Sequence, residues 1–126
     1  MRWRNDGARW GAVAKLLHWS MAALMIYGAL LAVYLVNQDP DVEANRLRYI
    51  NWITVHKSVG LTVFALVFLR LIWLRLNPRP ETAGHASRGE RLASHLAHGS
   101  LYALMIVLPV IGFFSSNSVG ATTHFW

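Results

Sequence analysis

Apolar and polar stretches alternate along the chain in long blocks, and three apolar blocks are separated by two polar connections. The apolar blocks lie at about residues 12–36, 52–74 and 92–114. In the first block, no Asp, Glu, Lys or Arg occurs from Leu16 to Val36. A helix needs about 20 such residues to cross the hydrocarbon core of a bilayer. The pattern therefore predicts an all-α protein, a transmembrane helical bundle with three spans.

The connections at about residues 37–50 and 75–91 are predicted to be loops, because both are polar and contain proline. Basic residues are unevenly distributed around the spans, and cytoplasmic loops of membrane proteins carry an excess of Lys and Arg. We therefore expect a multi-pass membrane protein with a cytoplasmic N-terminus. The basic residues that precede the first span or follow the second are Arg2, Arg4, Arg9, Lys15, Arg75, Arg79, Arg88 and Arg91, against only Arg46 and Arg48 in the intervening connection.

The composition agrees with a membrane protein, since 55% of the residues are hydrophobic, only 14% are charged, and the mean hydropathy is +0.33. The net charge of +6 could indicate a nucleic-acid partner. However, the Lys and Arg residues cluster at the flanks of the spans, which favours contact with membrane lipid and no nucleic-acid binding. The absence of cysteine excludes disulfides, thiolate-ligated clusters and thioether-attached haem.

Three histidines on three different spans are candidates for a functional site: His18, His56 and His98. Antiparallel threading of the helices places His18 and His98 at a similar depth, because each lies near the cytoplasmic start of its span. His56 lies near the outer end of the second span, roughly 15–20 Å away by helix rise. The sequence therefore predicts one site near each membrane surface.

A histidine inside a membrane is costly unless a partner or a ligand satisfies it, so each is a functional hypothesis. The alternatives are a hydrogen bond between helices or an imidazole that reaches the headgroups. A zinc-type site requires several ligands close together, and no carboxylate lies within the spans. Haem requires only one or two axial imidazoles and some room beside the helix. Small residues that could leave this room are Ala22, Gly60 and Gly99.

Three stretches, "KLLHW", "VHKSVGLTVFALVFLRLIWLRLNPRP" and "LAHGSLYALMIVLPVIGF", resemble the prokaryotic cytochrome b561 family. The resemblance covers residues 14–112. It implies a bundle of four helices that binds haem b, with His18 as an axial ligand of the cytoplasmic haem and His56 as an axial ligand of the outer one. His98 matches a third-helix histidine of the family, and it is either the opposite axial ligand at the level of His18 or a neighbour of the haem.

This sequence departs from the family pattern after Phe114, because no fourth apolar block follows. We therefore expect a single domain over residues 1–126 that is incomplete at its C-terminus, with one or two haems. A partner subunit that supplies the fourth helix is an alternative.

Arg70 is the remaining candidate for the site. It lies about 21 Å along the helix from His56, which places it near the level of His18. There its guanidinium could pair with a haem propionate or a quinone oxygen, since arginine suits carboxylates in bidentate geometry. The alternative is a side chain that reaches the cytoplasmic headgroups.

The function that the resemblance implies is electron transfer between quinone or quinol and a second redox partner. Oxidoreductase activity of the superoxide:quinone or quinol-linked type is compatible with the resemblance. The alternative is a haem-free or haem-degenerate structural subunit of a larger membrane complex.

Overall fold

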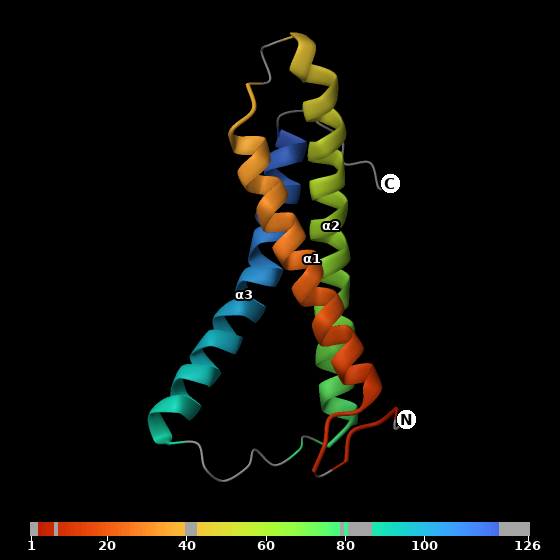
Figure 1. Ribbon diagram of the computed structural model, residues 1–126, viewed down its shortest axis with the longest axis vertical. Coiled ribbons are helices and arrows are strands. Elements are labelled where there is room, and N and C mark those ends of the chain that lie inside the picture. The colour runs from red at the N-terminus through yellow and green to blue at the C-terminus, as the bar shows by residue number, and fades with distance from the viewer. Residues whose placement is uncertain (1–2, 7, 40–42, 79, 81–86, 119–126) are drawn as a thin grey trace.

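The computed structural model describes residues 3–6, 8–39, 43–78, 80 and 87–118, which form three α-helices and no strand (Figure 1). The helices are α1 (Ala12–Val36), α2 (Glu43–Leu76) and α3 (Arg88–Ser118). They run up, down and up, so that the start of α1, the end of α2 and the start of α3 lie at the same end. All three are long and apolar enough to cross a membrane, which confirms the predicted fold class.

The predicted boundaries need correction at the beginning of α2 and at both ends of α3, which extends over residues 88–118 where 92–114 were expected. Residues 43–50 were expected to be loop, but they form the first two turns of this helix. A helix that leaves the hydrocarbon keeps its backbone hydrogen bonds while its side chains meet water, so it can continue through a polar sequence. Glu43 lies in the first turn, where a negative charge favours the positive end of the helix dipole.

The start of α3 is fixed by a capping box. The backbone N–H of Glu90 donates to Ser87 Oγ at 3.2 Å, and the backbone N–H of Ser87 donates to Glu90 Oε2 at 2.7 Å. These two bonds satisfy donors that a helix start otherwise leaves without partners. As a result α3 begins at Arg88, four residues before the apolar block.

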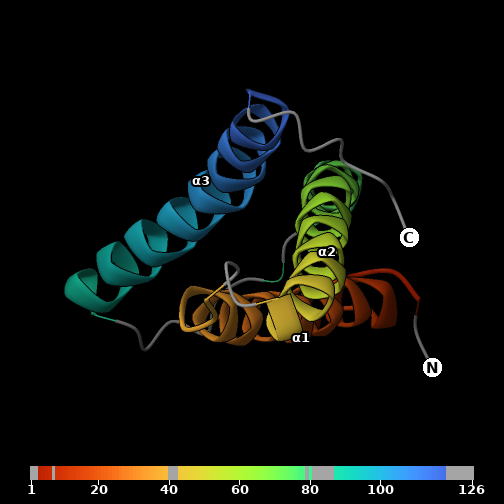
Figure 2. The ribbon, with the colours of Figure 1, turned by 90° about the horizontal axis from the view of Figure 1, so that it is seen from above.

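The helix α2 is the centre of the packing. It contacts both α1 and α3, whereas α1 and α3 do not pack against each other over their described lengths. Figure 1 shows α3 inclined away from the other two helices toward its own beginning, and in the view from above this beginning lies farther from α2 than the end of α3 does (Figure 2). Gly28 lies where α1 contacts α2, since a Cβ at this position would be in ordinary van der Waals contact with Val59 Cγ1, at 3.4 Å. The shared core consists of Met21, Val59, Val63, Val67 and Met105.

A short N-terminal segment, of which the structure describes residues 3–6 and 8–11, is tied to the end of α2. The buried side chain of Asn5 donates from Nδ2 to the carbonyl oxygen of Pro78 at 3.1 Å. The same amide accepts at Oδ1 from the backbone N–H of Gly11, at 3.0 Å. Asn5 therefore joins two parts of the chain that are 73 residues apart.

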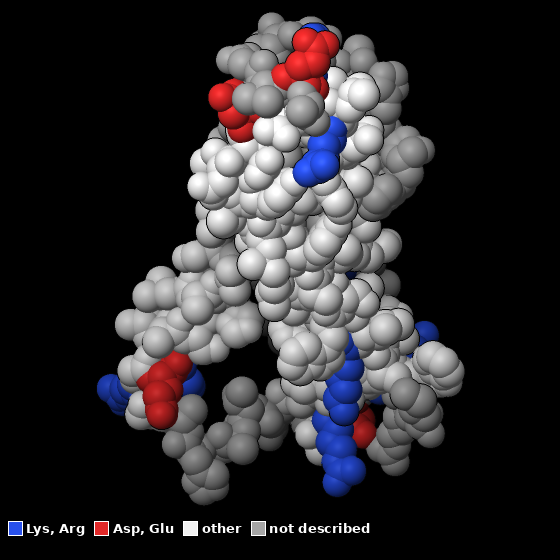
Figure 3. Space-filling model, turned by 45° about the horizontal axis from the view of Figure 1, so that its top comes forward, with Lys and Arg blue, Asp and Glu red and all other residues white. Residues whose placement is uncertain are grey.

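Charged side chains lie toward the two ends of the face shown in Figure 3, with uncharged surface between them. Many large apolar side chains of the helices are exposed, among them Ile26 and Leu30 of α1 and Leu69 of α2. An apolar band of this kind is the surface that a helical bundle presents to lipid.

Candidate functional site

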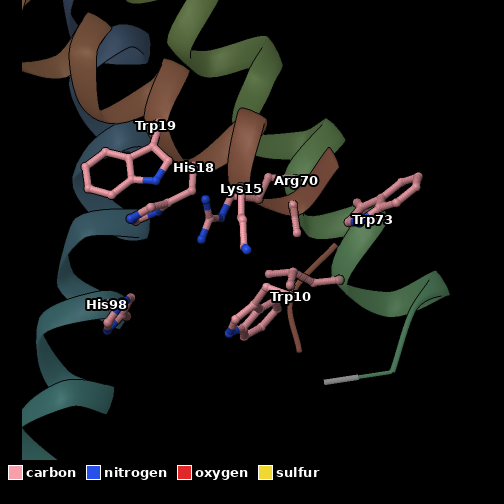
Figure 4. A pocket seen from close by; sticks show the side chains of 9 residues that line it. Trp10, Lys15, His18, Trp19, Arg70, Trp73 and His98 are labelled. Carbon is pink, nitrogen blue, oxygen red and sulfur yellow. The ribbon is translucent and has the colours of Figure 1, made fainter. Parts of the chain in front are cut away.

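The divergence of α3 from α1 leaves a cavity of about 340 Å³ near the end of the bundle where α1 begins (Figure 4). All three helices contribute to it. The lining residues are Trp10, Ala14, Lys15, His18, Trp19, Arg70, Trp73, Leu74 and His98. A pocket for a small ligand or cofactor typically encloses about 300–1,000 Å³, so the cavity is large enough to receive part or all of one.

Helical spacing explains how the lining is built. On α1, Ala14, Lys15 and His18 follow the three- and four-residue spacing that places side chains on one face of a helix. On α2, Arg70 and Leu74 are likewise four residues apart. Two predicted site residues on α1 and α2, His18 and Arg70, thus meet at one level.

His98 on α3 lines the same cavity as His18. Figure 4 shows the two imidazoles on different helices, with His98 facing the α1 and α2 side chains. The structure therefore brings together three of the four predicted site residues, as the depth argument from the sequence expected. The shared depth of these three residues was predicted from helix rise alone. The cavity between α1 and α3 was not predicted.

The ring of His98 is held by its own helix. Its Nδ1 lies 2.7 Å from the carbonyl oxygen of Ser94, one turn earlier. A carbonyl can only accept, so Nδ1 carries the proton and donates it, and Nε2 keeps its lone pair. This is the arrangement that metal-ligating histidines commonly show. His95 makes the same bond to the carbonyl oxygen of Arg91 at 2.7 Å, but it does not line the cavity.

Arg70 is held by a hydrogen bond between helices that the sequence did not reveal. Its Nε donates to the hydroxyl oxygen of Tyr102 at 2.8 Å, which joins α2 to α3. Tyr102 follows His98 by four residues, so both point to the same side of α3. The signal in the sequence was this spacing, but it gave no partner for the tyrosine.

The cavity is cationic. Lys15 and Arg70 both line it, and no aspartate or glutamate is among its lining residues. Lys15 precedes His18 by one turn, a spacing that would have identified it from the sequence. An anionic or carboxylate-bearing ligand is favoured in such a space, while two imidazoles are available to a metal centre.

His56, the fourth predicted site residue, lies toward the opposite end of α2 and does not line this cavity. Its Nδ1 is buried and has no hydrogen-bond partner in the described part of the chain. Gly60, one turn later, faces open space, because a Cβ there would meet nothing within 4 Å. A buried polar atom without a partner calls for an explanation, and a ligand near His56 with room at Gly60 would supply one.

The donor set fits a haem better than a bare metal ion. No group of three or more His, Asp or Glu side chains that could hold a metal ion occurs among the described residues. Haem needs only one or two imidazoles, and its two propionates match the two cations of the cavity. The room at Gly60 and at Gly99, where an added Cβ also meets nothing within 4 Å, is consistent with a flat group beside the helix.

The sequence of this chain matches a known protein family over most of its length. The sequence profile of the family described as prokaryotic cytochrome b561 matches residues 9–126. Cytochrome b561 homolog 2 of Escherichia coli (strain K12) is 26% identical over 125 residues, which is 95% of this chain and 62% of that protein. The chain therefore spans less than two thirds of this relative's length. No solved structure matches the chain significantly. The chain belongs to the prokaryotic cytochrome b561 family.

Proposed function

We propose that this protein is a membrane cytochrome that holds haem b and passes electrons between a quinone and a second redox partner. Membership of the family supports a membrane b-type cytochrome of electron transfer. The observation that carries the proposal is the shared cavity, in which His18 of α1 and His98 of α3 face one space together with two cations.

In this proposal His18 would hold the haem iron, and His98 would either hold it as well or lie beside the group. The bond from Nδ1 of His98 to Ser94 leaves Nε2 available and fixes the ring. The side chains of Arg70 and Lys15 would form ion pairs with the haem propionates. The bound haem supplies reversible one-electron redox chemistry. The tryptophans of the lining, Trp10, Trp19 and Trp73, reduce the access of water to the space.

His56 is proposed as an axial ligand of a second haem near the other membrane surface. Its buried Nδ1 and the open space at Gly60 support this role. Fourteen residues separate His56 from Arg70, which is about 21 Å of helix rise. The two sites thus lie at different depths, as electron transfer from one side of a membrane toward the other requires.

The proposal includes an orientation, with the N-terminus in the cytoplasm of a bacterium and the cavity near the cytoplasmic surface. The basic residues described at this end, including Arg4, Arg9, Arg75 and Arg88, support it through the positive-inside rule. Arg2 and Arg79, which the sequence argument also used, lie outside the described residues. Membrane lipid contacts the exposed apolar band, and quinone reaches the haem from this lipid phase.

The test is the visible spectrum of the purified protein in detergent or lipid discs. We expect sharp b-type bands in the reduced-minus-oxidised spectrum. In the pyridine haemochrome assay, His18→Ala should lose one haem's share of the signal. His95→Ala is the matched control, since His95 makes the same bond to its helix but does not line the cavity. A parent protein without haem bands would favour a structural subunit instead. Equal haem in His18→Ala and the parent would overturn the assignment of His18.

A further inference from the structure

Tyr102 occupies a special position on α3. All residues of this helix from 88 to 101 are exposed, and Tyr102 is the first that is partly buried. It packs against the core formed with α2, and its hydroxyl accepts from Nε of Arg70 at 2.8 Å. Tyr102 therefore marks the point where α3 leaves α2, one turn above His98.

The bond to Tyr102 uses only part of the arginine. A guanidinium has five N–H donors in one plane, of which Nε supplies one and the two terminal Nη groups supply four. Fixing Nε from one side restricts the rotation of the plane, and the Nη groups remain available. Because Arg70 lines the cavity, these groups can meet a carboxylate there in the bidentate geometry that arginine favours.

We propose that Tyr102 is a positioning residue, which holds the guanidinium of Arg70 in place for a carboxylate of the ligand in the cavity. This inference rests on the proposed function, in which that carboxylate is a haem propionate. Arg70 makes the contact with the ligand, and Tyr102 acts through it. The hydroxyl is the essential feature, since phenylalanine would keep the ring in the core but offer no acceptor.

The expected consequence is electrostatic. A fixed positive charge close to a redox group disfavours the additional positive charge of the oxidised state, and this effect is larger where water is excluded. A guanidinium that is no longer held can turn toward water and lose part of this effect. Tyr102→Phe should therefore lower the midpoint potential of the haem in the cavity and change the pH dependence of that potential, while the haem content stays at the parent level.

The experiment is a double-mutant cycle on the full chain with bound haem, read by spectroelectrochemical titration over a range of pH. The variants are Tyr102→Phe, Arg70→Gln and the combination of both, with Tyr27→Phe as the control, because Tyr27 is an exposed tyrosine of α1. If Tyr102 acts through Arg70, Tyr102→Phe lowers the potential in the parent and causes no further shift in the Arg70→Gln background. Equal shifts in both backgrounds, or none in either, would overturn the inference.

A second measurement distinguishes a Tyr102 that positions Arg70 from a Tyr102 that only stabilises the packing of α3 on α2. The chain has no cysteine, so spin labels can be attached at Ile72→Cys on α2 and Leu96→Cys on α3, two exposed positions. If Tyr102 positions Arg70, Tyr102→Phe leaves the main distance between the two spin labels unchanged. A broadened distance with less haem, and an unchanged potential in the haem that remains, would show a structural role and refute the inference. A parent protein that contains no haem would refute the proposed function itself. The haem content of the parent reports this result separately from the midpoint potential.

Discussion

Gly11→Ala is the substitution whose consequence can be derived most directly from the structure. Gly11 lies directly before α1, at the end of the N-terminal segment. A Cβ at this position would lie 2.5 Å from the carbonyl carbon of Arg4 and 2.5 Å from the carbonyl oxygen of Trp3. Real Cβ atoms essentially never approach other atoms so closely, and both neighbours are backbone atoms. The segment must therefore move away from α1.

The size of the effect follows from the bonds that this movement breaks. The Asn5 side chain would lose its bonds to Gly11 and Pro78. Each such bond contributes roughly 1 kcal/mol net, so the attachment of the segment weakens by about 2 kcal/mol. That corresponds to an increase of about 30-fold in the population of the detached segment. Trp10 belongs to this segment and lines the cavity, so detachment also opens one wall of the site.

Limited proteolysis measures this population, because cleavage follows the open fraction when opening is fast. We expect trypsin to cut after Arg4 and Arg9 much faster in Gly11→Ala than in the parent. Gly60→Ala is the control, since a Cβ at Gly60 meets nothing within 4 Å. Hydrogen exchange at the Gly11 amide, which Asn5 protects, should rise in parallel. Cleavage and exchange at the parent rates would refute the reasoning from the close contact.

Three other predictions concern the second site, the core and the orientation. His56→Ala should lower the pyridine haemochrome signal while the part that depends on His18 persists; equal haem content would contradict the second site. Val67→Ala removes two methyl groups from a fully buried position of α2 and should destabilise the bundle by about 1–2 kcal/mol in detergent unfolding, with an unchanged midpoint as the contrary result. A protease-sensitive tag within residues 81–88 should be cut only from the cytoplasmic side, and one within residues 39–45 only from outside; the reverse pattern would invert the orientation.

The sequence was sufficient for the helices because each span is an apolar run of the length a bilayer requires, as between Leu16 and Val36. The sequence was insufficient to predict the residues at which the helices begin and end. The turns of α2 at residues 43–50 contain Glu43, Arg46 and Arg48, which interrupt the apolar run, and the helix continues there because its backbone hydrogen bonds continue. The N-terminal segment was also missed, since the contact between Asn5 and Pro78 depends on tertiary structure.

The same distinction applies to the candidate site: the depth of its residues could be predicted from the sequence, but the contacts between its helices could not. Helix rise gives the depth of a residue, and depth alone placed His18, His98 and Arg70 at one level. It does not give the direction in which helices tilt or which side chains meet across them. The bond between Arg70 and Tyr102 and the cavity between α1 and α3 depend on this tilt, so the sequence could not predict them.

The absence of direct packing between α1 and α3 has a thermodynamic consequence. In the described part of the chain the two helices are related only through α2, so their relative position depends on two interfaces in series. A group ligated by both His18 and His98 would add a third, direct connection and close a ring of contacts. Its binding free energy would then appear as rigidity of the α1–α3 arrangement, by the same linkage that stabilises metal-dependent folds. Removal of the group should accordingly increase hydrogen exchange first in the exposed half of α3, while the core around Val67 remains protected.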